Sequence, residues 1–268
     1  MSTRFNCVAA IQARMGSTRL PGKVLADVGG KPLIQRIVER VRQAALVDEV
    51  FVLTSDARTD DILAERLEEL AIPFRRGPVE DVLTRYLDLV EELGPSHLVR
   101  VTGDCPFVEP DFIDLQLGAL RAFDADLVRV VASVPGAIDG TLGGQSACSA
   151  RALRAVQASD DPRDREHVGA FFFVRHAREF HAVELEVAPE LERPGLRLQV
   201  DEPEDLEFVR RVWSAVDLER DGLFPLTRAL RWIDAHPEVR ACNRHVRESA
   251  DNQALRALAQ RAGASPRP

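Results

Sequence analysis

Short apolar runs alternate along the first half of the chain with longer stretches in which apolar residues recur at helical spacing. The apolar or β-branched runs, typical of buried strands, cover residues 8–11, 50–54, 97–101 and 126–132, with a shorter extended piece at 73–76. The helical stretches cover residues 33–45, 62–70, 79–93 and 110–122. This alternation predicts an α/β fold with a Rossmann-like, open, mainly parallel sheet, helices on both faces and right-handed crossovers.

The second half of the chain is less regular. Residues 134–149 carry four glycines and predict a mobile loop or a hairpin that could close over a substrate. Ser149 is a good N-cap for a helix through residue 158. Residues 196–200 predict a last strand, and Pro203 starts the helix behind it. From residue 240 the chain is polar and rich in alanine and arginine, which predicts a frayed tail.

The polar segment after the first strand concentrates positive charge. It holds three cations together with hydroxyls and backbone breakers: Arg14, Gly16, Ser17, Thr18, Arg19, Pro21, Gly22 and Lys23. Backbone N–H groups and cations in one loop are suited to binding a polyphosphate. The alternative is a solvated basic turn, but the loop directly follows a buried strand, where open α/β sheets bind ligands. Neither GxxxxGK[ST] nor GxGxxG occurs here, so this loop signals neither a Walker-type NTPase nor a dinucleotide-binding dehydrogenase.

Two aspartates follow predicted strands. Asp104 comes after Thr102-Gly103 and should lie at the carboxyl end of the sheet, beside the basic loop. A carboxylate next to a triphosphate needs a divalent cation between them, and Mg²⁺ prefers such oxygen ligands. A turn or cap before Pro106 is the alternative role. Asp201 repeats the arrangement, although an aspartate before a helix is usually a cap.

Composition narrows the range of functions. The 268 residues carry a net charge of -8, which argues against a general nucleic-acid-binding protein. The four cysteines form no CxxC pair, so a zinc site or redox dithiol is not indicated and reduced thiols are expected. Neither a secretion signal nor a membrane-spanning run is apparent, and we expect a cytoplasmic protein.

The segment IQARMGSTRLPGKVL resembles the signature of the cytidylyltransferases that activate sugar acids, most closely their spore-coat-polysaccharide (SpsF-like) branch. The superfamily includes the 3-deoxy-manno-octulosonate and acylneuraminate cytidylyltransferases. The resemblance recurs at FRRGPVEDVLTRY, VRVTGDCPFVEP, DPRDREHV and LQVDEPEDLEFV, and so spans about residues 5–215. It implies a single nucleotidyltransferase domain over residues 1–240, with residues 134–185 as an acceptor and dimerisation region and residues 241–268 as a polar tail.

The resemblance also implies a reaction: an acceptor oxygen attacks the α-phosphorus of CTP and expels pyrophosphate. Arg14, Lys23 and Asp104 are then the expected catalytic residues, and Asp104 and Asp201 the ligands of Mg²⁺. The expected nucleotide-binding residues are Gln12, Ala13, Arg14, Gly16, Ser17, Arg19, Lys23, Thr54, Ser55, Gly77, Asp81, Val82 and Thr102. On the acceptor side the candidates are Arg76, Arg85, Gln145, Glu166 and His167, although Arg85 could equally be a surface ion-pair partner. Relatives are usually dimers, and the apolar cluster around Phe171 to Phe173 offers a surface for a homodimer.

One departure from the family pattern concerns the acceptor. SpsF-like proteins commonly follow the aspartate-glycine of this region with an acidic strand, whereas Asp139-Gly140 is followed here by TLGGQSACS. We therefore expect an anionic acceptor that differs from the usual sugar acid, for example a smaller one or a phosphonate or phosphate compound. Two alternatives stay open: a sugar-nucleotide-dependent glycosyltransferase and a nonenzymatic nucleotide-binding regulator.

Overall fold

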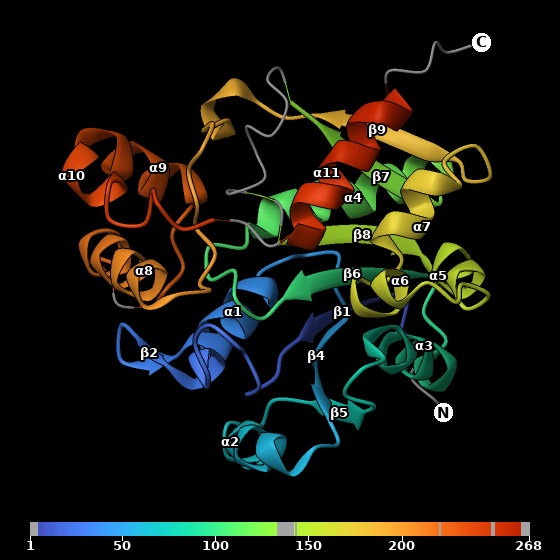
Figure 1. Ribbon diagram of the computed structural model, residues 1–268, viewed down its shortest axis with the longest axis horizontal. Coiled ribbons are helices and arrows are strands. Elements are labelled where there is room, and N and C mark those ends of the chain that lie inside the picture. The colour runs from blue at the N-terminus through green and yellow to red at the C-terminus, as the bar shows by residue number, and fades with distance from the viewer. Residues whose placement is uncertain (1–4, 133–141, 143, 220, 248–249, 264–268) are drawn as a thin grey trace.

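A seven-stranded mixed sheet forms the centre of the computed structural model, which describes residues 5–132, 142, 144–219, 221–247 and 250–263 (Figure 1). Its strand order is β5-β4-β1-β6-β8-β7-β9. The strands are β1 (Cys7–Gln12), β4 (Glu49–Ser55), β5 (Phe74–Gly77), β6 (His97–Thr102), β7 (Leu127–Val131), β8 (Gln145–Ser149) and β9 (Ala182–Glu186). Only β8 runs antiparallel to its neighbours, β6 and β7, and the other pairings are parallel. The predicted α/β fold with a mainly parallel sheet is therefore confirmed.

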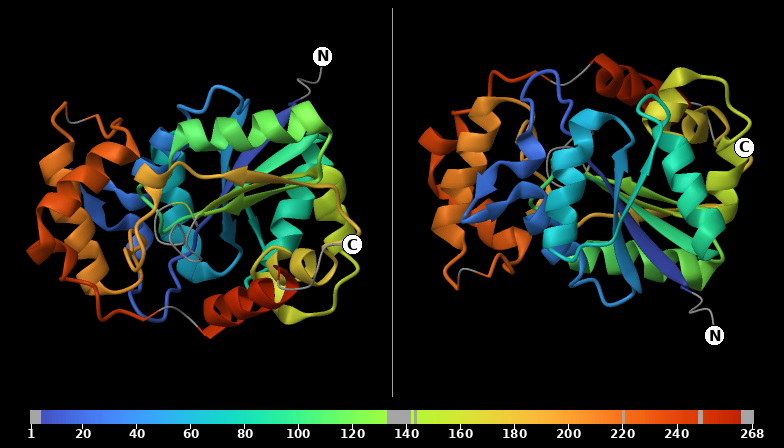
Figure 2. Two further views of the ribbon diagram at one scale, coloured as in Figure 1. Left: turned by 90° about the horizontal axis from the view of Figure 1, so that it is seen from above. Right: turned by 90° about the horizontal axis from the view of Figure 1, so that it is seen from below.

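Helices cover both faces of the sheet (Figure 2). On one face lie α1 (Leu33–Val41), α2 (Asp61–Glu69) and α4 (Pro110–Phe123); on the other lie α3 (Val82–Leu93) and α5 (Ala150–Val156). Alternate residues of β1 enter the two cores: Ala9 and Ile11 join the first, and Val8 and Ala10 the second. Burial on both faces explains why this strand is an unbroken apolar run.

The remaining elements extend the two layers. Beyond α1, the helix α8 (Pro203–Val216) packs against α9 (Leu226–Ala235), which is followed by α10 (Pro237–Arg240). A small hairpin of β2 (Asp27–Val28) and β3 (Lys31–Pro32) lies before α1. On the second face, α6 (Pro162–Glu166) and α7 (Ala170–Arg175) follow α5. The last helix, α11 (Ala250–Gly263), lies beside α7 (Figure 1).

Three local predictions differ from the structure. Residues 196–200 are not a strand: Leu196, Leu198 and Val200 are buried in alternation, but the only sheet-like bond among the described residues runs from Val200 N to Asp104 O. The expected frayed tail contains α11, which finds a partner in α7. The third predicted helix begins at Val82 rather than residue 79, because the Asp81 side chain caps it by accepting from Thr84 N. Residues 133–141 and 143 of the predicted glycine-rich loop lie outside the described residues.

Candidate functional site

The carboxyl ends of β1, β4 and β6 meet where the basic loop leaves β1. Gly103, directly after β6, donates its N–H to Gln12 O at 2.8 Å. A Cβ at Gly103 would lie 2.7 Å from the same carbonyl oxygen, so only glycine lets the turn approach β1 this closely. This approach brings Asp104 to the start of the basic loop.

Lys23 joins the two predicted metal-binding aspartates. Its Nζ donates to Asp104 Oδ2 at 2.9 Å, to Asp201 Oδ1 at 2.8 Å and to Val200 O at 2.7 Å. Burial by itself would lower the pKa of Lys23, but the charges and hydrogen bonds of both aspartates outweigh burial and raise the pKa above its ordinary value. Burial would likewise raise the pKa of Asp104, and the Lys23 ammonium instead holds it below the usual range. Both groups of this pair are therefore charged at neutral pH.

Asp201 is held by a buried network that the sequence did not indicate. Asp205 Oδ2 accepts the N–H groups of Asp201 and Glu202 at 3.0 and 3.1 Å, as the capping box of α8 requires. Arg197 bridges the Asp201 and Asp205 carboxylates. Asn243, from the segment after α10, donates to Asp205 Oδ1 at 2.8 Å. Asp201 is thus both next to a helix start, as expected of a cap, and directed at Lys23.

The basic loop is anchored by a residue that we did not predict. Asp60 is 1% exposed; its Oδ1 accepts Met15 N at 2.7 Å, and its Oδ2 accepts Ser55 N at 3.2 Å and the Ser55 hydroxyl. It therefore ties the loop to the end of β4. A signal was present in the sequence, because Asp60 ends the polar turn that follows this strand.

The loop cations differ in their partners. Arg14 makes no hydrogen bond or ion pair with any residue that the structure describes. Arg19 pairs with Asp201 at 2.9 Å and Glu202 at 3.3 Å. Ser17 Oγ accepts Leu20 N, and Gly16 is exposed. Arg14 is thus the loop cation most available to an anionic ligand.

The two carboxylates fit a divalent cation, because Asp104 Oδ2 and Asp201 Oδ1 already converge within 3 Å of one positive charge. Carboxylate oxygens are the ligands that Mg²⁺ prefers. The chemistry of this donor set would therefore hold Mg²⁺ once Lys23 has moved.

The predicted nucleotide-binding residues at the strand ends form two groups. Thr54 is fully buried and Ser55 is 1% exposed, so neither side chain is open to a ligand in this structure. Ala13 is also buried, and its N–H bonds Leu53 O at 3.0 Å. By contrast, Gln12 and Thr102 end neighbouring strands and are partly exposed. The first group builds the strand ends, and the second lies at their open side.

The loop after β5 is held by hydrogen bonds and by one ion pair. Gly77 ends β5, and its carbonyl accepts Asp56 N at 2.8 Å. Asp81 caps α3 and pairs with Arg165 of α6, while Val82 is buried. Asp81 therefore connects α3 to α6 instead of facing solvent.

Three of the predicted acceptor residues are engaged within the chain. Arg76 donates to Ser55 O and Ala57 O and pairs with Asp61. Arg85 donates to Pro78 O and Val79 O, each at 2.8 Å, so it is buried under the loop and is not a surface ion-pair partner. Gln145 exchanges hydrogen bonds with the backbone of Glu109 on the α4 side. These three side chains are therefore bonded within the chain in this structure, and their role toward an acceptor stays a prediction.

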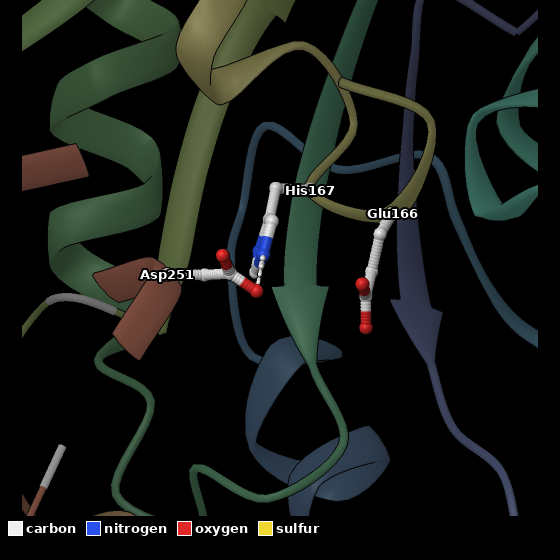
Figure 3. A group of neighbouring side chains, drawn as sticks. All are labelled: Glu166, His167 and Asp251. Atoms are coloured by element: carbon white, nitrogen blue, oxygen red, sulfur yellow. Dashed lines mark ion pairs between the residues drawn. The ribbon is translucent and has the colours of Figure 1, made fainter. Parts of the chain in front are cut away.

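The other two, Glu166 and His167, lie together with Asp251 of α11 (Figure 3). His167 Nε2 is 3.5 Å from Asp251 Oδ2 and has no hydrogen-bond partner among the described residues. Ligand atoms of all three residues lie within 4.8 Å of one another. The tail helix thus adds an acidic group to the predicted acceptor side, which could not be read from the sequence.

Arg100 is a further cation near the strand ends that the sequence did not single out. It lies on β6, and its Nε donates to Gln12 Oε1 at 3.0 Å. Tyr86 OH lies 3.4 Å from the same oxygen. An isolated arginine in the otherwise apolar strand HLVRVT was the available signal.

Comparison with known proteins identifies the family of the chain. The profile of the cytidylyltransferase family matches residues 8–221, which include the basic loop, Asp104 and Asp201. The chain belongs to the cytidylyltransferase family. It is 35% identical over 209 residues to the spore coat polysaccharide biosynthesis protein SpsF of Bacillus subtilis, covering 76% of this chain and 85% of that protein.

Two solved structures are similar to this cytidylyltransferase. A cytidylyltransferase from Leptospira borgpetersenii superposes with a TM-score of 0.78 at 25% identity, covering 88% of this chain and 97% of that one. CMP:2-keto-3-deoxy-manno-octonic acid synthetase, solved in complex with CTP, superposes with a TM-score of 0.61 at 21% identity, covering 78% and 98%. The second likeness shows the shared fold. The chain is therefore a nucleotidyltransferase that transfers CMP from CTP, as the resemblance implied, and the glycosyltransferase and regulator alternatives lose their support.

Among the described residues, no helix is long and apolar enough to cross a bilayer.

Proposed function

We propose that this cytidylyltransferase joins CMP from CTP to an oxygen of an anionic, hydroxyl-bearing small molecule, releases pyrophosphate and uses Mg²⁺. The supporting observation is the convergence of Asp104 and Asp201 on one cation beside the basic loop. The acceptor oxygen bonds the α-phosphorus while its hydroxyl proton passes to water, and the bond from that phosphorus to the bridging oxygen of the leaving pyrophosphate breaks. Mg²⁺, when bound, neutralises phosphate charge and polarises the phosphoryl group.

The protein's own residues position the reactants and neutralise charge. Arg14 has no partner among the described residues and would bind phosphate oxygens. Lys23 would bind the triphosphate, and Arg19 would lie at its rim. Asp104 and Asp201 would hold the metal. Gln12 and Thr102, at the open strand ends, remain candidates for contact with the nucleotide.

The acceptor side supports a polyhydroxylated anion. Glu166, His167 and Asp251 provide hydrogen-bond acceptors for hydroxyl groups, whereas Arg100 lies beside Gln12, a candidate for nucleotide contact. The segment TLGGQSACS that departs from the family pattern is described at residues 142 and 144–149, and its part Gln145–Ser149 forms β8 without a carboxylate. The choice between a sugar acid and a phosphonate or phosphate compound stays a prediction.

The test is a pyrophosphate-release assay with CTP, Mg²⁺ and a panel of octulosonate, neuraminate, smaller sugar acids and phosphonates. The expected product is a CMP conjugate, identified by mass spectrometry. Asp104→Asn should reduce turnover by about 10² to 10³, the usual cost of losing one charge-stabilising group. Tight CTP binding without turnover on any acceptor, or wild-type activity in D104N, would contradict the proposal.

The homodimer stays a prediction as well. Phe171 belongs to the core, and Phe172 and Phe173 are partly buried against it, so part of the expected apolar surface is used within the chain. Light scattering of the purified protein measures its mass in solution and so tests whether it is a dimer.

A further inference from the structure

The Asp104–Asp201 site already holds a cation of the chain itself. An ammonium group has three N–H donors, and Lys23 uses all of them on Asp104, Asp201 and Val200 O. The Lys23 side chain is 10% exposed, and the two carboxylates are 16% and 11% exposed. The ammonium is therefore a fully bonded, nearly buried counter-ion.

The cations around this site nearly balance its carboxylates. Four carboxylates, Asp104, Asp201, Asp205 and Glu202, face three side-chain cations, Lys23, Arg19 and Arg197, which leaves a single surplus negative charge. An ion bound about 2.1 Å from the Asp104 and Asp201 oxygens would lie no more than about 5 Å from Lys23 Nζ. A divalent cation added beside the Lys23 ammonium would then give the poorly solvated cluster a net positive charge, which is unfavourable.

A triphosphate changes this balance, because it brings several negative charges and offers Lys23 new oxygen partners. Lys23 lies at the end of the basic loop, in the short turn Lys23–Leu25, so its flexible side chain can turn from the carboxylates toward that loop. Arg14, without a partner among the described residues, lies in the same loop to receive the same anion.

We propose that Lys23 is the resident cation of the Asp104–Asp201 pair and excludes divalent metal until CTP draws it onto the triphosphate. Nucleotide binding then opens the metal site, and the metal enters with or after CTP. This inference rests on the proposed function for the identity of the metal ligands, and it adds an order of binding that the reaction alone does not require.

The test measures binding of Mn²⁺, as a probe for Mg²⁺, by electron paramagnetic resonance without nucleotide. Lys23→Met keeps the apolar stem and removes the ammonium. We expect K23M to bind Mn²⁺ about tenfold to a hundredfold more tightly than the wild type, since a hydrogen bond between charged groups contributes on that scale. Lys31→Met is the matched control, because Lys31 pairs with Glu39 at 2.7 Å on the surface and should leave Mn²⁺ affinity unchanged.

A second readout covers the loss of stability expected when two buried carboxylates lose their cation. Mn²⁺ should raise the melting temperature of K23M far more than that of the wild type, and adding Asp201→Asn to K23M should abolish this rescue. If K23M does not fold, Mn²⁺ binding to the wild type still tests the proposal, because weak binding without nucleotide supports the exclusion of metal by Lys23.

Two outcomes would overturn the proposal that Lys23 excludes the metal until CTP binds: tight Mn²⁺ binding to the wild type without nucleotide, or equal Mn²⁺ affinities in the wild type and K23M. Either outcome leaves cytidylyl transfer intact if the wild type still releases pyrophosphate from CTP, so the two proposals fail separately.

Discussion

Removing the Asp60 carboxylate should release the basic loop from β4. In Asp60→Ala, the N–H groups of Met15 and Ser55 lose the acceptors that now lie at 2.7 and 3.2 Å. Each buried donor left unsatisfied costs about 1–3 kcal/mol, so D60A should lose about 4 kcal/mol of unfolding free energy. Asp60→Asn keeps one acceptor for Met15 but turns a donor toward Ser55 N, so we expect a smaller loss of about 1–3 kcal/mol.

The same change should weaken nucleotide use, because the anchored Met15 directly follows Arg14 in the loop that also carries Lys23. A displacement of about 1 Å in a positioned group can cost up to about a hundredfold, so KM for CTP should rise by about tenfold or more in D60N. Urea unfolding followed by circular dichroism gives the stability, and pyrophosphate release gives KM. Asp56→Asn is the control, since Asp56 is exposed in the same turn.

A loss of less than about 1 kcal/mol of unfolding free energy in D60A would refute this role of Asp60, because that is the smallest cost of one unsatisfied buried donor. An unchanged KM for CTP in D60N would refute it as well. In either case the loop would owe its position to contacts other than this carboxylate.

Two further predictions concern the strand ends and pH. Gly103→Ala places a Cβ 2.7 Å from Gln12 O, so it should cost about 1–3 kcal/mol in urea unfolding and lower CTP turnover; wild-type stability would contradict it. The side-chain hydrogen bond from Arg163, with help from Arg175, lowers the pKa of Asp161 to about 2, so its contribution to stability is present above pH 4 and is lost as the pH falls toward 2. The free energy of unfolding of the wild type should therefore exceed that of Asp161→Asn by about 1 kcal/mol at pH 6, after allowance for solvent screening. This difference should be smaller at pH 3, and a difference that does not change with pH would refute the lowered pKa of Asp161.

The sequence was sufficient where local pattern and topology determine the outcome. The apolar runs became β1, β4, β6 and β7, and β1 and β4 are continuously apolar because both faces of these strands are buried. The carboxyl ends of parallel strands meet at one edge, which brought Lys23 and Asp104 together as expected.

The sequence pattern did not predict features that depend on contacts between residues far apart in the chain. Nothing local to Gln145–Ser149 shows that β8 inserts antiparallel between β6 and β7, because that register depends on a ladder to residues 97–101. Residues 196–200 have the burial alternation of a strand without a neighbouring strand to pair with. The sequence likewise did not show that backbone carbonyls of the adjacent loops accept hydrogen bonds from Arg76 and Arg85.

The segment after α10 connects the parts of the site, although it lies beyond the family match at residues 8–221. Asn243 donates to Asp205, and the Arg247 carbonyl accepts from Arg19 at 3.3 Å. Asp251 then reaches His167. This stretch therefore contacts Asp205 next to the proposed metal ligand Asp201, Arg19 of the basic loop and His167 on the proposed acceptor side. The first two contacts support residues proposed to bind the metal and the triphosphate, and the third lies on the proposed acceptor side. If these proposals hold, variation in this segment can alter acceptor choice only when it preserves the first two contacts.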